Sequence, residues 1–534
     1  MPTLPKPLPG RLLAAALAAN LAAACLAASP ADAKTLRIGV QADAGTMDPQ
    51  AQNIQTTINL ISMIYEPLVT RDKSLAKAPA LAESWSQVEP ATWRFKLRPG
   101  VTFHDGSPFT AADVAFTIKR AQGPTSQFTS YVAGFEAKPV DDLTVDITTP
   151  KPDPLLADKL TYVPIMSRAW AEKNNALAPQ NLKDKQESYT ALNANGTGPY
   201  RLVSRAPDSK TVLARSPKYW GRMDGDIDEV VWTPVGSDPT RVAALLSGEL
   251  DLVTDVPAQD VARLQANPEL KLSKVDEFRT IFFGFDLKND ALKYGDAGDK
   301  NPFKDLRVRQ AINLAVDRDA MVRVVMRGLA SPTTQILAPG NVGYDAALDR
   351  AVRTNRDEAK RLLAEAGYPN GFAFTFDCPN DRYVNDEQVC KTMATMLSQV
   401  GLKPTLNSMP RARYFPKVWD RDTSMFMMGF NSPYFDGMYA LETLLMTRDD
   451  KKGEGIYNYA NLSDPALDTE IAAARDEADP GKRAAMMKVL FKRVTDQAYY
   501  VSLYNQVLVY ASRKAVDAPV RPDNWLEIRW VTMQ

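Results

Sequence analysis

Strand-like and helix-like segments follow one another along almost the whole chain, and this alternation restricts the fold more than any other feature. Runs rich in β-branched and aromatic residues predict strands at 36–40, 93–97, 143–148, 211–215, 229–233, 280–286, 372–378, 424–430 and 499–510. Residues 357–366 and 386–400 carry apolar side chains at helical spacing, and a glycine follows each segment. The sequence therefore predicts a mixed α/β fold, and its 534 residues are enough for two or three domains.

The segment from Leu97 to Arg120 shows the alternation at close range. A strand ends at Leu97, and Pro99-Gly100 and Asp105-Gly106 are turn dipeptides. Thr110 and Asp113 then have the spacing of a capping box, which predicts that a helix begins directly after Thr110.

The N-terminus has the parts of a secretory signal peptide. Lys6 and Arg11 form a basic start, residues 12–28 are rich in alanine and leucine, and Ala31-Asp32-Ala33 fits a small-x-small cleavage site. The apolar run is shorter than the ~20 apolar residues that a membrane-spanning helix needs. The sequence thus predicts a signal peptide over residues 1–33 and a soluble mature protein in the periplasm.

The cysteines raise two questions. Cys25 suggests a lipoprotein anchor, but Ala22 stands where the lipidation motif prefers leucine, so anchoring is the less favoured alternative. In an exported protein, Cys378 and Cys390 suggest a disulfide. Two buried free thiols are the alternative.

The charge balance excludes some classes of partner. The chain carries 64 basic and 64 acidic residues, so no strong overall field favours nucleic acid or an anionic membrane. Removal of residues 1–33 takes away Lys6, Arg11 and Asp32 and leaves the mature chain almost neutral.

The sequence also lacks the usual apparatus of an enzyme. A serine or cysteine nucleophile would have to use His104, the single histidine, but His104 lies in a predicted turn, where a structural hydrogen bond is expected. No Gly-x-Ser-x-Gly elbow or phosphate-binding loop is present, and zinc sites need more His or Cys ligands. The acidic run 224–228 departs from a calcium loop at Glu229 and Val235. We therefore expect no catalytic residues, no metal site and no cofactor.

Several sequence motifs resemble those of one protein family. These are LRPGVTFHDGSPFTAADVAF (97–116), GTGPYRL (196–202), SPKYWG (216–221), LLSGELDL (245–252) and FKDLRVRQAINLAVDR (303–318). In this order they resemble the landmarks of the family 5 extracellular solute-binding proteins, the peptide, nickel and opine receptors of bacterial ABC importers. The resemblance extends over nearly the whole mature chain.

The resemblance implies a two-lobed fold of type II, similar to the large cluster C receptors, with an extra inserted subdomain. One lobe would contain residues 34–77, 196–284 and 506–534, with the subdomain at 78–195, and the other lobe residues 285–505. The chain would cross between the lobes near Phe285 and Tyr504, forming a two-stranded hinge.

The first candidate binding segment, residues 378–386, leaves a predicted strand and enters a predicted helix. Arg382 is the preferred partner for a ligand carboxylate, because a guanidinium binds carboxylate in a bidentate fork. Asn380 and Tyr383 lie beside it. An ion pair of Arg382 with Asp381 or Asp386 is the alternative.

The second candidate segment, residues 425–437, is an apolar strand that opens into an aromatic loop. Phe430 and Tyr434 are suited to form cavity walls, and Asn431 is a polar candidate. Peptide-binding relatives carry an aspartate for the α-amino group where this chain has Pro433. Asp436 is the candidate substitute, and the standard peptide clamp is therefore in doubt.

Three further residues complete the predicted site. Arg411 lies in a basic and aromatic segment that suits an anionic ligand, although a surface strand end is an equal alternative. Gln55 follows a loop that the resemblance places at the cleft, and Tyr504 lies near the predicted second crossing.

The sequence thus predicts a monomeric periplasmic receptor that delivers a small solute to an ABC permease with a separate ATPase. A peptide or peptide-like compound is the leading ligand class, ahead of opines, glycosides and metal chelates. A secreted hydrolase and a chemosensory receptor are the alternative functions.

Overall fold

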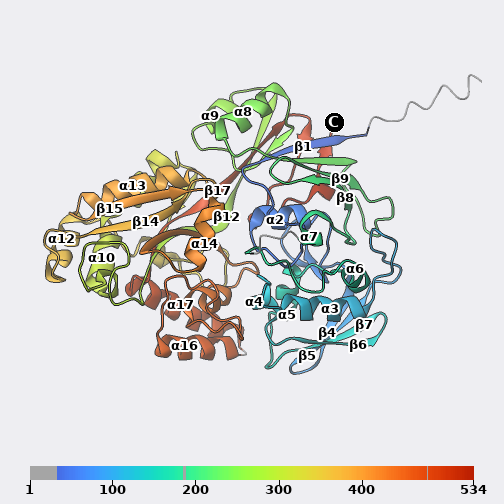
Figure 1. Cartoon of the computed structure of the whole chain (residues 1–534), viewed down its shortest axis with the longest axis horizontal. Coiled ribbons are helices and arrows are strands. Elements are labelled where there is room, and N and C mark those ends of the chain that lie inside the picture. The colour runs from blue at the N-terminus through green and yellow to red at the C-terminus, as the bar shows by residue number, and fades with distance from the viewer. Residues whose placement is uncertain (1–32, 184–187, 478) are drawn as a thin grey trace, which may run out of the picture.

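The computed structural model describes residues 33–183, 188–477 and 479–534 (Figure 1). The predicted signal peptide, apart from its last residue, and Cys25 lie outside these residues. Among the described helices, none is long and apolar enough to cross a membrane.

One large mixed sheet runs through the molecule. Its strands, in spatial order, are β15 (Lys403–Met409), β14 (Ala373–Pro379), β16 (Met425–Asn431), β12 (Leu270–Phe285), β17 (Tyr500–Arg513), β11 (Leu252–Val253), β1 (Thr35–Val40), β10 (Glu229–Pro234), β9 (Lys210–Arg215) and β8 (Tyr200–Ala206). An eleventh strand, β13 (Ala330–Pro332), pairs with β17. Three helices lie beside the β14–β15 end in Figure 1, namely α10 (Leu306–Ala315), α12 (Arg356–Glu365) and α13 (Asp386–Ser398).

The two longest strands, β12 and β17, join the two ends of the sheet (Figure 1). They pair antiparallel with each other, while β16 extends one side of the pair and β11 the other. Their register shifts between Asp276 and Thr280, and again between Ile281 and Phe282. Glu277 and Phe278 therefore lie in a bulge at the centre of the sheet.

Each end of the sheet has its own core. Beside β14 and β15, Phe283, Ile312 and Leu397 belong to one buried cluster. Beside β1 and β10, Ile38 and Trp232 belong to another, and a third lies under α8 (Asp238–Ser247) and α9 (Val261–Gln265). Each end of the sheet thus forms a lobe with its own core, and a further buried cluster, which includes Phe95, Phe282 and Tyr439, joins segments from distant parts of the chain.

A second sheet of four antiparallel strands lies apart from the first, at the lower right of Figure 1. Its order is β4 (Ala82–Glu89), β5 (Thr92–Leu97), β7 (Thr144–Thr148) and β6 (Glu136–Asp141). Helix α3 (Ala111–Ala121) packs on β6 and β7 and begins at the predicted capping box, in which the Asp113 carboxylate accepts a hydrogen bond from the Thr110 amide at 2.9 Å. The strand–turn–helix prediction for this segment is confirmed.

The remaining elements are short or lie at the rim. Two short strand pairs are β2 (Val69–Arg71) with β3 (Lys77–Pro79) and β18 (Val516–Asp517) with β19 (Thr532–Met533). The further α-helices are α2 (Gln55–Ile61), α4 (Thr129–Val132), α5 (Leu156–Lys159), α6 (Arg168–Lys173), α7 (Tyr189–Leu192), α11 (Arg318–Ala320), α14 (Arg411–Trp419), α15 (Met438–Ala440), α16 (Pro465–Asp476) and α17 (Pro480–Asp496).

The predicted strands are all present, and their ends agree within a few residues, with one exception. The strand predicted to begin at Thr280 begins at Leu270. Its first half alternates exposed and half-buried side chains and includes Lys271, Lys274 and Asp276, so it lacks the continuous apolar pattern of its second half.

Candidate functional site

A cavity of about 100 Å³ lies between segments from distant parts of the chain, and we call it the aromatic chamber. Its lining includes Asn53, Gln55, Gln127, Tyr131, Tyr162, Arg279, Arg382, Tyr383, Phe415, Trp419, Phe430, Asn431, Pro433, Tyr439, Tyr457 and Tyr459. Loops and helix starts supply most of these side chains, whereas Arg279 and Phe430 stand on the paired strands β12 and β16. Strands β12 and β16 thus form the floor of the chamber, and the loops and helices form its walls.

Aromatic rings form its walls by packing on one another. The Tyr131 ring is stacked on Tyr162 at 5.5 Å and on Tyr439 at 5.6 Å between centroids, and Phe430 is stacked on Tyr439 at 5.5 Å. Rings held in this way present flat apolar surface to a solute with little loss of side-chain freedom.

Hydrogen bonds cross the chamber directly. Asn53 Nδ2 donates to the Tyr457 hydroxyl at 2.8 Å and to the Tyr131 hydroxyl at 3.2 Å. Outside this cavity, Arg411 Nη1, on α14, donates to Thr56 Oγ1 at 3.1 Å, and Arg411 Nη2 donates to the Asp43 carbonyl. Side chains from distant segments are therefore in direct contact here.

Arg382 is the one candidate whose charged group has no protein partner. Among the described residues its guanidinium forms no hydrogen bond or ion pair, and its Nε is buried without a partner. It lies over the Tyr383 ring, 4.8 Å from the centroid. Burial lowers the pKa of Arg382, Arg279 adds to this shift, and the nearby carboxylates of Glu277 and Asp255 oppose it. A half-buried guanidinium without an ion-pair partner favours an anionic ligand.

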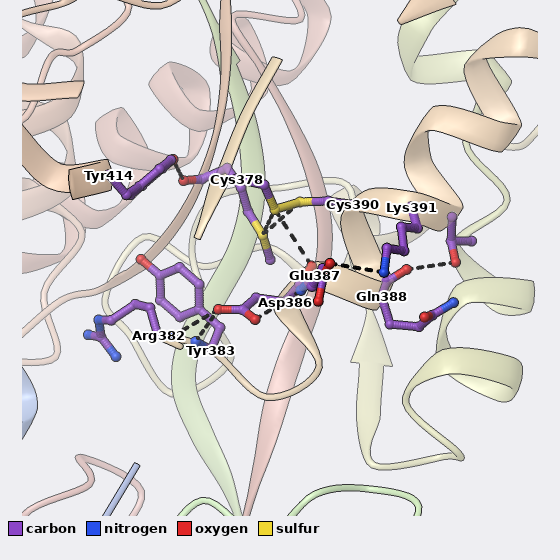
Figure 2. Close-up of a disulfide and its surroundings, with 11 residues drawn as sticks. Cys378, Arg382, Tyr383, Asp386, Glu387, Gln388, Cys390, Lys391 and Tyr414 are labelled. Atoms are coloured by element: carbon purple, nitrogen blue, oxygen red, sulfur yellow. Dashed lines mark hydrogen bonds and ion pairs between the residues drawn. A yellow bond between two sulfur atoms is a disulfide. The ribbon is translucent and has the colours of Figure 1, made fainter. Parts of the chain in front are cut away.

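The alternative of an ion pair between Arg382 and Asp386 is wrong. The Asp386 carboxylate instead accepts hydrogen bonds from the backbone amides of Arg382 at 2.9 Å and Tyr383 at 3.0 Å. In Figure 2 the guanidinium points away from that carboxylate. Nor does Arg382 pair with Asp381, which accepts a hydrogen bond from the Arg411 amide. Asp386 thus fixes the backbone of the loop, and the Arg382 guanidinium has no ion-pair partner in the part of the chain that the structure describes.

A disulfide joins Cys378, on β14, to Cys390, on α13, as the sequence predicted (Figure 2). The bridge closes the loop that carries Arg382 and Tyr383. Both sulfur atoms lie against the Met427 sulfur, at 3.6 and 3.4 Å. The loop is therefore tied to the strand floor of the cavity.

Reduction of this bridge is expected to lower the free energy of unfolding by at most about 3 kcal/mol, because a loop of this length then regains entropy in the unfolded chain. Urea unfolding with and without a phosphine reductant measures the difference. A Cys378→Ala/Cys390→Ala variant is the control and should not respond to reductant. Equal stability of oxidised and reduced wild type would contradict the expectation.

Arg279 was missed by the sequence analysis. Its Nε donates to Glu277 Oε1 at 2.8 Å, and both side chains are almost fully buried. Gln506 and Asn524 donate to the same carboxylate at 3.2 and 3.3 Å. Its position directly before the strand predicted at 280–286 was the one sequence feature that could have indicated it.

A second, smaller cavity of about 30 Å³ adjoins the first, and we call it the polar chamber. Gln55 and Arg382 line both cavities. The other lining residues of the polar chamber are Val40, Gln41, Ala42, Thr56, Asn59, Trp232, Thr254, Asp255, Asp381, Arg411 and Asn524.

The two chambers bring together six of the ten predicted site residues. Gln55, Arg382, Tyr383, Phe430 and Asn431 line the aromatic chamber, and Arg411 lines the polar chamber. Asn380, Tyr434, Asp436 and Tyr504 line neither chamber.

Each of these four residues has a different surrounding. Asn380 is exposed. Tyr434 is buried behind the wall, its ring edge-on to Tyr131 and Tyr439, and Tyr504 is fully buried in the strand core. Asp436 is held by Arg483 through two hydrogen bonds, at 2.7 and 2.8 Å, and its carboxylate is thus already neutralised.

A small apolar cavity lies behind Tyr162 and Ile58, which also line the aromatic chamber, and Glu66 forms part of its wall. The Glu66 carboxylate accepts hydrogen bonds from Thr197, Tyr219 and Trp220 at 2.7–2.9 Å. Burial nevertheless raises the pKa of Glu66 to about 7.

This raised pKa predicts a pH dependence of stability. Between pH 4.5 and about 7 the folded carboxyl keeps its proton while the unfolded one has lost it, so the unfolding free energy falls as pH rises, by at most about 1.4 kcal/mol per pH unit. Urea unfolding of wild type and Glu66→Gln from pH 5 to 8 isolates this slope. A difference between the two proteins that stays constant with pH would contradict the assignment.

His104 has a structural role, as predicted. Its Nδ1 accepts a hydrogen bond from the Gly196 amide at 3.4 Å, and its Nε2 donates to the Gly198 carbonyl at 2.9 Å. Burial lowers the pKa of the ring. Both ring nitrogens are thus occupied in joining the 103–107 turn to the 196–198 segment.

Comparison with known proteins relates this site to a family. The model for the middle region of the bacterial extracellular solute-binding proteins, family 5, matches residues 77–452. The glutathione-binding protein GsiB of Pectobacterium atrosepticum is 27% identical over 519 residues, which cover 95% of this chain and 96% of that protein.

Solved structures agree in fold. DppA from Helicobacter pylori, in complex with the peptide STSA, superposes with a TM-score of 0.81 at 22% identity, covering 93% of this chain and 98% of that chain. AgaA from A. tumefaciens R10, in complex with agropinic acid, superposes with a TM-score of 0.80 at 24% identity, covering 94% and 99%. These periplasmic binding proteins share the two-lobed α/β fold described above. With the family model matched over most of its length, the chain belongs to the bacterial extracellular solute-binding proteins of family 5.

Proposed function

We propose that the mature protein works in the periplasm, after removal of residues 1–33, as the monomeric receptor of an ABC importer. It captures a small peptide-like solute that carries a carboxylate and delivers it, chemically unchanged, to a membrane permease served by a separate ATPase. The protein is a solute-binding protein by family. The solute class and the partners are the proposed part.

The observation that carries the proposal is the unpaired Arg382 guanidinium in the wall of the aromatic chamber. A half-buried guanidinium without an ion-pair partner is incompletely solvated, and a bidentate ligand carboxylate would supply the missing partner. Phe430, Tyr439 and Tyr457 supply apolar surface for the body of the solute, and Asn431 and Gln55 supply polar contacts.

The proposed lobes are residues 34–77, 196–284 and 506–534, with the inserted subdomain 78–195, against residues 285–505. In this division β12 and β17 carry both crossings. Because Phe283 packs in the core beside β14 and β15, we propose that the crossing on β12 lies nearer to the bulge at Glu277 and Phe278 than to Phe285. The bonds from Asn53 to Tyr457 and from Arg411 to Thr56 then join opposite lobes, and they support closure over the solute.

The peptide-like class is supported by the named relatives. GsiB is a glutathione-binding protein, and the DppA structure holds a peptide. The AgaA complex with agropinic acid makes an opine the second candidate class, and a carboxylate is the feature that Arg382 would recognise in both.

Small-angle scattering and calorimetry test the proposal together. We expect glutathione, the dipeptide Ala-Phe or an opine acid to evolve heat on binding and to reduce the radius of gyration, because closure needs differential contacts with the closed form. Mass spectrometry of the recovered solute should show it unaltered. Unchanged scattering and no heat with every carboxylate-bearing compound would overturn the proposal.

A further inference from the structure

The polar chamber is lined by acidic and basic side chains, and its two aspartates form no ion pair within the described part of the chain. Asp255, Asp381, Arg382 and Arg411 all line it. Among the described residues neither aspartate forms a side-chain ion pair: the Asp255 carboxylate accepts one hydrogen bond, from Thr254 Oγ1 at 3.1 Å, and Asp381 accepts one, from the Arg411 amide at 2.6 Å. Both carboxylates retain acceptor capacity toward a cation.

Asp255 is firmly placed despite its position in a loop. It follows β11, and its backbone lies in the left-handed region, with φ of 53°. The Arg241 guanidinium, which is fully buried, donates from Nη2 to the Asp255 carbonyl at 3.1 Å. Arg241 thus fixes the backbone of the loop at Asp255. The Asp255 side chain forms no ion pair with any residue that the structure describes.

The chamber also contains donors without acceptors. Trp232 is 1% exposed, and its indole Nε1 has no hydrogen-bond partner. Arg382 Nε is buried in the same state. The chamber thus has hydrogen-bond donors without acceptors and carboxylates without cations. A ligand that satisfies both would carry an anionic group and a cationic group.

The size of the chamber limits what enters it. At about 30 Å³ it accepts a charged head group and not a whole solute. Gln55 and Arg382 line both chambers, so a solute with its head here would extend its body among the rings of the aromatic chamber.

We propose that the polar chamber binds an α-amino acid head group, with the solute's ammonium on Asp255 and Asp381 and its carboxylate on Arg382 and Trp232. This inference rests on the proposed function and narrows its solute class to compounds that carry a free ammonium and a carboxylate on one carbon. Asp255 takes the part that Asp436 cannot fill while it is paired with Arg483.

The test uses glutathione, whose γ-linked glutamyl end is such a head group, and its N-acetyl derivative, which lacks the ammonium. Calorimetry on wild type should show at least tenfold weaker binding of the acetylated compound, because a charged hydrogen bond is lost. With Asp255→Asn, glutathione should bind at least tenfold more weakly than to wild type, and acetylation should change the affinity by less than about threefold. Asp290→Asn, whose side chain is 95% exposed, is the matched control and should behave as wild type.

Three other results would each contradict a different part of the proposal. An acetylation effect of equal size in wild type and Asp255→Asn would overturn the role of Asp255. Binding of Ala-Phe, whose ammonium and carboxylate stand on different residues, without binding of glutathione would overturn the single-carbon head group. Binding of no carboxylate-bearing compound at all would instead overturn the proposed function.

Discussion

Replacing Asp436 by alanine is expected to lower the free energy of unfolding by about 3–5 kcal/mol, because it leaves the Arg483 guanidinium buried without its counter-ion. The side chains of Asp436 and Arg483 are 4% and 8% exposed, and two parallel hydrogen bonds join them. Asp436 also accepts a hydrogen bond from the Met438 amide at 2.9 Å. Urea unfolding at neutral pH measures the loss.

An exposed ion pair gives the matched control. Lys492 and Asp496 pair on the same helix, α17, with side chains 63% and 55% exposed, so Asp496→Ala should cost less than about 1 kcal/mol. Replacing Asp436 by leucine and Arg483 by methionine together removes both buried charges and should restore much of the stability. If Asp436→Ala were as stable as wild type but failed to bind solute, Asp436 would be a ligand residue after all.

Replacing Arg382 by alanine is expected to weaken solute binding by about 2–5 kcal/mol, roughly thirtyfold or more, because the solute carboxylate is then buried without its cation. Calorimetry with the carboxylate-bearing compound that closes the wild-type protein measures this loss. The variant should fold about as stably as wild type without solute, since the Arg382 guanidinium is half-buried and forms no ion pair among the described residues.

Two further variants make this result specific. Arg382→Lys keeps a charge but loses the bidentate fork and should fall between wild type and alanine. Arg222→Ala removes a side chain that is 89% exposed and should bind as wild type does. Wild-type affinity in Arg382→Ala would remove Arg382 from the site.

Much of the fold could be predicted because strands and helix starts have local sequence patterns. Continuous apolar runs marked β14 and β16, and the Thr110–Asp113 pair marked the start of α3. The first half of β12 was missed because its residues pair with β17 while exposing polar side chains, and pairing between segments more than two hundred residues apart leaves no local trace. The bridge between Cys378 and Cys390 was predicted from export, not from geometry.

The site was predicted only in part, for a related reason. Arg382 stood out because it is a guanidinium, suited to a ligand carboxylate, in the loop between a predicted strand and a predicted helix. Tyr439 and Tyr457 were not predicted, because folding alone stacks Tyr439 on Tyr131 and places Tyr457 beside Tyr439. Asp436 has the expected chemistry, but its partner Arg483 is remote in sequence, so only the structure shows that it is already engaged.

The bulge of β12 lies beside the aromatic chamber. At Glu277 and Phe278 the ladder with β17 is interrupted, and the next residue, Arg279, lines the aromatic chamber. A bulge bends its strand and increases the local twist. Under the closure proposed above, a solute in contact with Arg279 would therefore lie directly beside a bend in one of the two strands that connect the lobes.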